Sequence, residues 1–328
     1  MTARVALKVD ADTLRGTLEG VPRLRELLRR YRVNATFLFS LGPDNTGRAL
    51  RRIFRPGFFA KVMRTSVAAN YGLKTLCYGT LLPGPDISEH GQDAMRAVRD
   101  AGFEVGVHCH DHVLWQDNVT TRDDSWTRRQ MQLAVEAFQR VFRDQPKVHG
   151  AAGWQINEYV PALEAELGFE YASDTRGIGP FTPAPVQQRA VCPQLPTTLP
   201  TFDEVIGLAG CTEHNVAEVV LDYSLAPPRR DHVFTLHAEL EGMRLLPAFE
   251  RLLQHWLERG LQPCSLRDLY LDLPAQLPAC AVELDEVLGR SGRLACQATV
   301  TDSSSSARRS AARGYARRVS GRRDAGAS

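Results

Sequence analysis

The 328-residue sequence lacks several features that would place it in a specialised class of protein. It has no run of about 18 apolar residues, which argues against a conventional transmembrane helix. Its amino terminus has no apolar segment of the kind found in secretory signal peptides, so we expect a cytoplasmic protein. Its seven cysteines contain no Cys-x-x-Cys pair, which favours reduced thiols over a disulfide framework or a structural zinc site. The remaining composition, 43% hydrophobic and 24% charged, is that of a globular protein.

Acidic residues are also missing from one long interval, between Asp44 and Asp86. Basic residues alternate there with aromatic and aliphatic ones, a composition typical of a segment that lies at a membrane interface. Basic side chains near anionic lipid contribute on the order of 1 kcal/mol each. A lid packed on the core and a nucleic-acid groove are the alternatives, although we expect no nucleic acid as a partner. We expect an insertion over about 45–87 that contacts an anionic membrane surface through Arg51, Arg52, Arg55, Phe58, Phe59 and Lys61.

Residues 299–328 carry seven arginines against two acidic residues and are otherwise rich in serine and alanine. Such a composition cannot build a packed core, so we expect a disordered tail. Basic tails bind polyanions such as lipid headgroups or nucleic acid, and an extension without a specific partner is the alternative. The folded domain is therefore expected to span residues 1–298.

Short apolar runs alternate with helical patterns along this domain. A repeated strand-then-helix order predicts an α/β fold with a parallel sheet, either open or closed into a barrel. The pattern predicts strands at 5–9, 35–40, 103–108, 147–152, 169–173, 190–195 and 231–237 and helices at 20–31, 88–102, 125–142, 213–225 and 245–260.

Candidate catalytic residues follow the first of these strands. Asp10 and Asp12 stand at its carboxyl end, where sites form in parallel α/β folds. Two carboxylates so close together need a metal or a shared proton to coexist. An Asp-x-Asp pair also occurs in caps and turns, which is the structural alternative.

A histidine cluster follows the strand at 103–108. His108 and His112 are four residues apart, so on one helical turn both imidazoles would face the same way, as metal binding requires. His110 would point elsewhere. A lone histidine is more often structural, but three histidines and Asp111 within five residues favour a metal. With Asp12, the pair His108 and His112 leaves coordination positions open, which suits a catalytic ion.

A third candidate, His237, ends the strand at 231–237 on the same predicted edge of the sheet. It is either a general acid or a histidine satisfied within the structure. Asp174 is the expected partner that orients it, unless this aspartate is a solvated loop residue. With a divalent ion on Asp12, His108 and His112, Asp10 as base and His237 as acid, the arrangement predicts hydrolysis of an amide.

The residues that carry this chemistry resemble the motifs of the NodB-type carbohydrate deacetylases. More specifically, the segments KVDADTLRGTLEGVPRL, FSLGPDNTGR, AAGW, SDTRG and TLHAELEG are similar to the ArnD family, the 4-deoxy-4-formamido-L-arabinose-phosphoundecaprenol deformylases. The resemblance is spread over residues 4–298.

This resemblance implies a distorted (β/α) barrel of the NodB type and a divalent metal ion, either Zn, Mn, Co or Ni. It implies that an amidohydrolase releases formate from undecaprenyl-phosphate-linked formamido-arabinose, peripherally at the cytoplasmic face of the bacterial inner membrane. The product would serve lipid A modification and polymyxin resistance. The implied roles are a base for Asp10, an acid for His237 and metal binding for Asp12, His108 and His112.

The sequence departs from the wider family in one motif. AAGW at 151–154 stands where NodB enzymes carry an Arg-x-Pro motif whose arginine steadies the base, and Arg176 is the expected substitute. His110 stands where an aromatic residue is expected. Trp154, Arg176 and Glu239 are expected to contact substrate.

Other functions explain less of the sequence. The nearest alternative is a NodB-type deacetylase of another N-acylated glycan or glycolipid. A glycosyltransferase with an Asp-x-Asp motif leaves the two histidines unexplained, and an iron oxygenase does not suit the strand-helix alternation. A membrane-binding protein without activity would not need Asp10 or His237.

Overall fold

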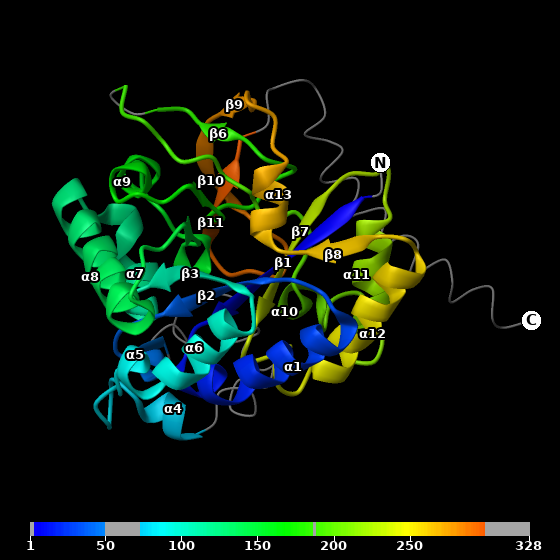
Figure 1. Ribbon diagram of the computed structural model, residues 1–328, viewed down its shortest axis with the longest axis horizontal. Helices are drawn as coiled ribbons and strands as arrows, with labels where there is room; N and C mark the ends of the chain where they lie inside the picture. Colours follow the sequence, from blue (N-terminus) through cyan, green and yellow to red (C-terminus); the bar gives the residue numbers. More distant parts are fainter. Residues whose placement is uncertain (1–2, 50–72, 186–187, 299–328) are drawn as a thin grey trace, which may run out of the picture.

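The computed structural model describes residues 3–49, 73–185 and 188–298. Its centre is a curled sheet of parallel strands in the order β5-β4-β3-β2-β1-β7, with β8 paired to the beginning of β1 (Figure 1). The strands are β1 (Arg4–Ala11), β2 (Thr36–Ser40), β3 (Glu104–Cys109), β4 (Val148–His149), β5 (Tyr171–Ala172), β7 (His232–His237) and β8 (Gln262–Cys264).

Helices cover the outside of this sheet. The longer ones are α1 (Val21–Tyr31), α6 (Gln92–Asp100), α8 (Asp124–Phe142), α11 (Val216–Ser224) and α12 (Leu246–Glu258). Shorter ones are α4 (Leu73–Cys77), α5 (Ile87–His90), α7 (His112–Asn118), α9 (Val160–Glu166), α10 (Phe202–Val205) and α13 (Leu266–Leu271), with single turns at η1 (Gly16–Gly20), η3 (Val119–Thr121) and η4 (Ala152–Trp154).

The core lies between the sheet and these helices. Strand β1 is buried along nearly its whole length, as expected for a central parallel strand covered on both faces. Helix α8 buries Met131, Val135, Phe138 and Phe142, whose spacing of three to four residues places them on one side of the helix. Phe37, Phe234 and Trp256 are fully buried between the layers.

An irregular segment, residues 194–199, closes the sheet into a distorted barrel. Gln194 forms a parallel bridge with Ala172 at the end of β5. The backbone N–H groups of Thr198 and Leu199 both donate to Val233 O of β7. The expected strand at 190–195 is thus an extended connection with isolated bridges, and it fills the gap between β5 and β7. The fold is therefore the expected distorted (β/α) barrel.

Two small sheets lie beside the barrel. The antiparallel hairpin of β10 (Val282–Glu286) and β11 (Arg293–Gln297) is joined to the barrel at Arg176, whose backbone exchanges hydrogen bonds with Ala295 and Gln297. The second pairs β6 (Thr182–Pro183) with β9 (Ala279–Cys280). The sequence pattern did not predict either sheet.

The other predicted elements agree with the structure apart from one break. The single helix expected at 88–102 is divided into α5 and α6 at Gly91, whose N–H donates to Ile87 O. A Cβ at Gly91 would lie 2.8 Å from that oxygen and 2.8 Å from Thr17, so only glycine allows this close packing.

Two expectations fall largely outside the described residues. The proposed membrane-contact side chains, all within 50–72, lie outside them, as does the predicted tail at 299–328. The described end of the insertion includes α4 and two exposed leucines, Leu81 at 84% and Leu82 at 43% exposure. Among the described helices, none has the length and apolar character needed to cross a membrane.

Candidate metal and catalytic site

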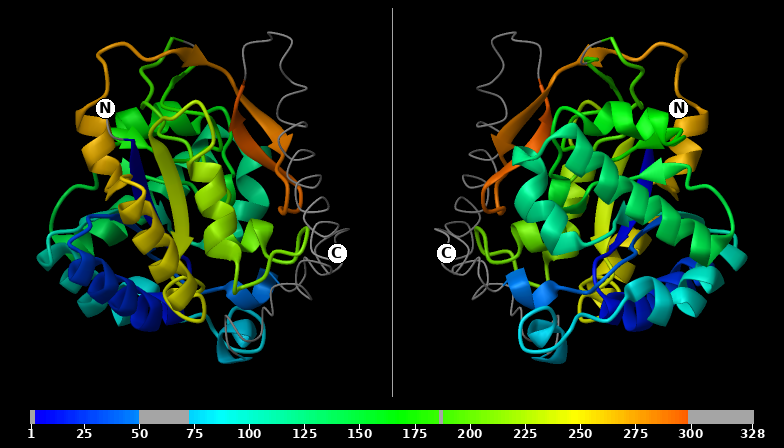
Figure 2. Two further views of the ribbon diagram at one scale, coloured as in Figure 1. Left: turned by 90° about the vertical axis from the view of Figure 1, so that its right-hand side faces the viewer. Right: turned by 90° about the vertical axis from the view of Figure 1, so that its left-hand side faces the viewer.

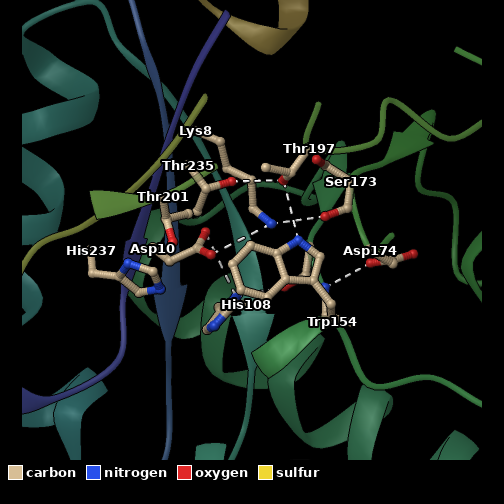
Figure 3. Close-up of polar contacts among 12 residues, drawn as sticks. Lys8, Asp10, His108, Trp154, Ser173, Asp174, Thr197, Thr201, Thr235 and His237 are labelled. Carbon is tan, nitrogen blue, oxygen red and sulfur yellow. Dashed lines mark hydrogen bonds and ion pairs between the residues drawn. The ribbon is translucent and has the colours of Figure 1, made fainter. Parts of the chain in front are cut away.

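The candidate catalytic residues meet at the carboxyl ends of β1, β3 and β7. Asp10 lies in β1 directly opposite His237 of β7 in the parallel register, so backbone pairing fixes the spacing of these two residues. His108 lies near the end of β3, and Asp12 follows β1 by one residue. The close-up in Figure 3 shows Asp10 between His237, His108 and Lys8.

Asp12, His108 and His112 form a group with the geometry of a metal site, which we call the metal group. Their ligand atoms lie within 4.8 Å of one another. Asp12 Oδ1 is 3.3 Å from His108 Nε2 and 3.5 Å from His112 Nε2. Burial opposes ionisation of Asp12, but the imidazoles of His112 and His108 outweigh burial and lower its pKa. Asp12 is therefore an anionic oxygen donor beside two imidazole nitrogens.

The hydrogen bonding of His108 fits this group to a divalent ion. His108 Nδ1 lies 2.6 Å from Gly150 O, and a carbonyl oxygen can only accept, so Nδ1 carries the hydrogen. In the neutral ring that metal binding requires, Nε2 presents its lone pair to the position that it shares with Asp12. A hydrogen bond from the other ring nitrogen, like that from Nδ1 to Gly150 O, is usual for histidines that bind metals. Asp12 Oδ1 is buried without a hydrogen-bond partner among the described residues, as expected of an atom that faces a cation.

The two histidines do not share a helical turn, which differs from the expected geometry. His108 belongs to β3, whereas His112 is the first residue of α7. The side chain of Asp111 caps this helix by accepting from Leu114 N and also accepts from Asn45 Nδ2 at 2.6 Å. The sharp change from strand to capped helix brings both rings to the same ion position.

His110 lies outside the metal group, as expected. Its ring packs against Gly42, where an added Cβ would come within 2.6 Å of the imidazole. Burial lowers the pKa of His110, which favours a neutral ring. This histidine is therefore part of the packing between the loops that follow β2 and β3.

The carboxylate of Asp10 is buried beside a lysine that the sequence analysis overlooked. Lys8 Nζ lies 3.5 Å from Asp10 Oδ2 and donates to Ser173 O at 2.8 Å. Lys8 is fully buried, and its place two residues before Asp10 puts both side chains on one face of β1. A lysine inside the apolar run VALKV was the available sequence signal.

Arg176 does not take the role expected of it beside Asp10. Its guanidinium binds Glu204 through two nitrogens, at 3.0 and 3.2 Å, and also donates to Leu199 O. It is almost fully buried. The cation next to Asp10 is therefore Lys8.

His237 is buried with an Nδ1 that has no hydrogen-bond partner among the described residues. Its backbone N–H donates to Glu241 Oε2 at 2.6 Å. Burial is the main cause that raises the pKa of Glu241 to about 8. Asp174, the expected partner of His237, instead has His149 Nδ1 at 3.1 Å from its Oδ1.

Trp154 forms the wall beside His237. The two rings make an edge contact with centroids 6.2 Å apart, and Trp154 Nε1 donates to Thr197 Oγ1. The cationic groups of Arg290 and Arg176 lie 4.7 and 5.2 Å from the Trp154 ring centroid. Its backbone φ of 52° is unusual for a bulky residue, which is typical of positions held in place for function.

Glu239 forms hydrogen bonds with the turn that carries Asp12. Glu239 Oε1 accepts from the backbone N–H groups of Asp12 and Thr13 and from Thr13 Oγ1. Burial raises its pKa well above the usual range. Its contacts with the turn after β1 suggest positioning, whereas the sequence analysis expected contact with substrate.

Solved structures share this fold at low sequence identity. A protein from Mycobacterium smegmatis described as a polysaccharide deacetylase aligns with a TM-score of 0.58 and 19% identity, over 84% of this chain and 92% of that one. Puue allantoinase aligns with a TM-score of 0.56 and 16% identity, over 82% and 90%. Residues 3–172 match the family model described as polysaccharide deacetylase. The protein is accordingly an amidohydrolase of the NodB-type polysaccharide deacetylase class.

Two curated relatives narrow the class further. Both carry the name "probable 4-deoxy-4-formamido-L-arabinose-phosphoundecaprenol deformylase ArnD". The Shewanella sediminis protein is 33% identical over 305 residues, which cover 93% of this chain and 98% of the relative. The Wigglesworthia glossinidia brevipalpis protein is 31% identical over 289 residues, which cover 86% and 98%. The chain belongs to the ArnD family.

Proposed function

We propose that this enzyme removes the formyl group from 4-deoxy-4-formamido-L-arabinose carried on undecaprenyl phosphate. The products are formate and the corresponding 4-amino sugar lipid. The observation that carries the proposal is the meeting of Asp12, His108 and His112 beside Asp10 and His237 at one edge of the sheet. The names of the two curated relatives support the choice of substrate.

Asp12, His108 and His112 are the residues that would hold the ion. One carboxylate oxygen and two imidazole nitrogens suit Zn, Mn, Co or Ni and leave coordination positions open. A divalent ion held there supplies Lewis-acid chemistry, which polarises an amide carbonyl and makes water nucleophilic at neutral pH.

The remaining residues move protons. Asp10 accepts the proton of the attacking water through Oδ1, which has no hydrogen-bond partner among the described residues, while Lys8 holds Oδ2. His237 donates a proton to the amide nitrogen as its bond to the formyl carbon breaks. Trp154 restricts the ring of His237 by its edge contact. The amine that leaves is basic, so protonation at this step makes the reaction favourable at neutral pH.

A lipid-linked substrate requires the site to work at a membrane. We assign contact with an anionic membrane surface to the insertion over about 45–87. The described end of this insertion exposes Leu81 and Leu82. The enzyme then acts peripherally at the cytoplasmic face of the bacterial inner membrane. Its amino sugar product carries a positive charge that offsets phosphate on lipid A, which is the chemical basis of polymyxin resistance.

Deacetylation of another N-acylated glycan or glycolipid is the second candidate, favoured by the description of the matched family model. The two functions are separated by incubating the full chain, loaded with Zn²⁺ or Mn²⁺, with the formamido-arabinose lipid and with an acetylated glycan. Formate from the lipid without acetate from the glycan supports the proposal. Acetate alone contradicts it.

The metal assignment has its own test. Asp12→Ala and His112→Ala are expected to lose bound metal by elemental analysis and to release no formate, because each removes one of three ligands. A variant that keeps stoichiometric metal would contradict the ligand assignment. His110→Ala is the matched control and is expected to keep the metal.

A further inference from the structure

A second group of ionisable side chains lies buried behind the candidate site. His149 of β4, Glu164 of α9 and Asp174 after β5 are each at most 2% exposed. His149 Nδ1 is 2.6 Å from Glu164 Oε1 and 3.1 Å from Asp174 Oδ1. Gln194 Nε2 donates to Asp174 Oδ2 at 2.7 Å. We call these three ionisable residues the His149 cluster.

Charge holds the His149 cluster together. Burial opposes a charged imidazole, but Asp174 and Glu164 outweigh burial and raise the pKa of His149 to about 10. The same cation outweighs the burial of Asp174 and lowers the pKa of that carboxyl group. Burial and the neighbouring Asp174 raise the pKa of Glu164 well above its usual range, so the ionised partner of the imidazolium is Asp174. An imidazolium donor in an apolar setting makes strong, charge-assisted hydrogen bonds. The contact of 2.6 Å is that of such a bond.

On one side, hydrogen bonds connect the His149 cluster to the metal group. Asp174 Oδ1 accepts from Ala151 N at 2.7 Å and so holds the residue after Gly150. Gly150 O is the acceptor that fixes Nδ1–H of His108. The backbone between His149 and Ala151 is therefore anchored at both ends, and its carbonyl orients a metal-binding imidazole.

On the other side, hydrogen bonds connect the His149 cluster to Lys8 beside Asp10. Ser173, which precedes Asp174, donates its backbone N–H to His149 O. Ser173 O accepts from Lys8 Nζ, the cation beside Asp10 (Figure 3). Gly150 leaves the space for this lysine, since a Cβ there would lie 3.1 Å from Lys8 Cε and 2.4 Å from a methyl of Leu38.

We propose that the His149 cluster is a positioning device for the active site. It clamps together the two chain segments whose carbonyl groups, Gly150 O and Ser173 O, orient His108 and Lys8. The inference rests on the proposed role of His108 as a metal ligand, whereas it does not depend on which amide the enzyme hydrolyses. The proposed role of the three cluster residues involves no contact with substrate.

Two substitutions of Asp174 separate charge from hydrogen bonding. Asp174→Ala removes the acceptor of Ala151 N and the partner of His149, and it is expected to weaken Zn²⁺ binding about 10- to 100-fold, as loss of an outer partner of a metal ligand does. Asp174→Asn keeps an oxygen for Ala151 N and is expected to fall between Ala and the unmodified protein. Affinity is measured on the purified full chain by competition with a chelator.

A second readout needs no metal. The proton on His108 Nδ1, held by the short bond to Gly150 O, is expected to give a downfield NMR resonance in the metal-free protein. That resonance should be lost or exchange faster in Asp174→Ala and Glu164→Gln. If Asp174→Ala does not fold, Asp174→Asn and Glu164→Gln carry both measurements, because their side chains keep the original size.

Leu253→Ala is the control for stability. Leu253 is fully buried in α12, and its truncation is expected to lower the stability of the fold because it leaves a cavity. It should leave Zn²⁺ affinity and the His108 resonance unchanged. Cluster variants that behave like Leu253→Ala would overturn the proposal, as would a second bound Zn²⁺ that Glu164→Gln abolishes. Formate release reports separately on the proposed function.

Discussion

Asp10 and Asp12 are separated by one residue, yet their surroundings give them different chemistry. The carboxylate of Asp12 faces two imidazoles, whereas that of Asp10 has a lysine on one oxygen and no partner among the described residues on the other. The first arrangement is that of a metal ligand, and the second leaves an oxygen free to take a proton. Two identical groups therefore acquire separate roles through their neighbours.

Asp10→Asn tests this separation directly. The variant is expected to bind metal with normal affinity, because Asp12, His108 and His112 are unchanged, while kcat for formate release falls about 100- to 10,000-fold. His237→Ala is expected to behave in the same way. Metal content and turnover are measured on the same preparations. Near-normal turnover would remove the substituted residue from proton transfer.

The raised pKa of Glu241 predicts that the stability of the folded protein depends on pH. Its pKa in the folded protein, about 8, lies above the ordinary value for glutamate, so the unfolded chain ionises this group more readily. The folded protein therefore loses stability as the pH rises from the ordinary value through about 8. Glu241→Gln is expected to be more stable than the unmodified protein at about pH 8.5, by on the order of 3 kcal/mol, and similar at about pH 4.5.

Urea denaturation at these two pH values measures the difference. Glu258→Gln is the matched control, since Glu258 is exposed at the end of α12. A Glu241→Gln variant whose advantage does not grow with pH would show that the buried carboxyl group is not the cause.

Four of the predicted site residues share one property, because each stands at or just after the end of an apolar run. Asp10, Asp12, His108 and His237 are polar where a parallel strand ends, which is where side chains reach the edge of the sheet. Lys8 and Glu241 escaped prediction because both are buried ionisable side chains whose partners, Ser173 O and His237 N, are backbone atoms. Sequence spacing carries no signal for such contacts.

At the scale of elements, the β10–β11 hairpin completes the wall of the site. Arg290, in the turn between the strands, binds Asp203 at 3.0 Å and Glu204 at 2.8 Å. Its guanidinium also lies over the ring of Trp154, which contacts His237. This hairpin lies beyond the residues matched by the polysaccharide deacetylase model.

Arg290→Ala is expected to lower stability by about 1–3 kcal/mol, since it removes charge-assisted hydrogen bonds from buried carboxylates. Because Trp154 loses a cation from its ring, kcat should fall several-fold while metal affinity stays unchanged. Thermal unfolding, formate release and chelator competition measure the three quantities. Arg293→Ala, which removes a side-chain bond to Leu284 O on the same hairpin, is the control. Equal effects of both substitutions would argue against the role of Trp154.

Elements with strong periodicity were predicted more reliably than those that depend on distant pairing. The strands of the barrel core and helices α8 and α12 follow their apolar patterns closely. The hairpin was missed because each strand has only five residues. In addition, β10 has no buried residue, and β11 is buried at four consecutive positions and does not alternate. The connection over 194–199 is extended only because β5 and β7 offer carbonyl groups on either side.

At the scale of the whole molecule, the candidate site and the described ends of the insertion, residues 45–49 and 73–87, lie at the same end of the sheet. The insertion begins after β2 and returns at Asp86, which bridges Pro43, and Asn45 binds the cap of α7. Figure 2 shows α4 beyond the end toward which β7 points. A membrane contacted by this insertion would therefore face the edge that carries the metal group.

Charge reversal tests the membrane contact. Replacing Arg51, Arg52, Arg55 and Lys61 with glutamate is expected to abolish sedimentation with anionic vesicles, since each basic residue contributes on the order of 1 kcal/mol. Circular dichroism checks that the fold is retained. Four exposed arginines elsewhere serve as the control: Arg23, Arg129 and Arg140 on other helices, and Arg259 directly after α12. Reversing them makes the same change in net charge and should preserve binding. Equal loss in both variants would show a general charge effect.

The register of β1 against β7 has a consequence for how the enzyme could acquire new substrates. Asp10 and His237 are held opposite each other by backbone hydrogen bonds, so no side-chain replacement elsewhere can move one without the other. A shift of one strand by one residue would turn its own group to the other face of the sheet and separate it from its partner. Variation among relatives in the acyl group or sugar they accept is therefore expected in the loops and the hairpin, while the spacing of Asp10 and His237 is expected to be common to them.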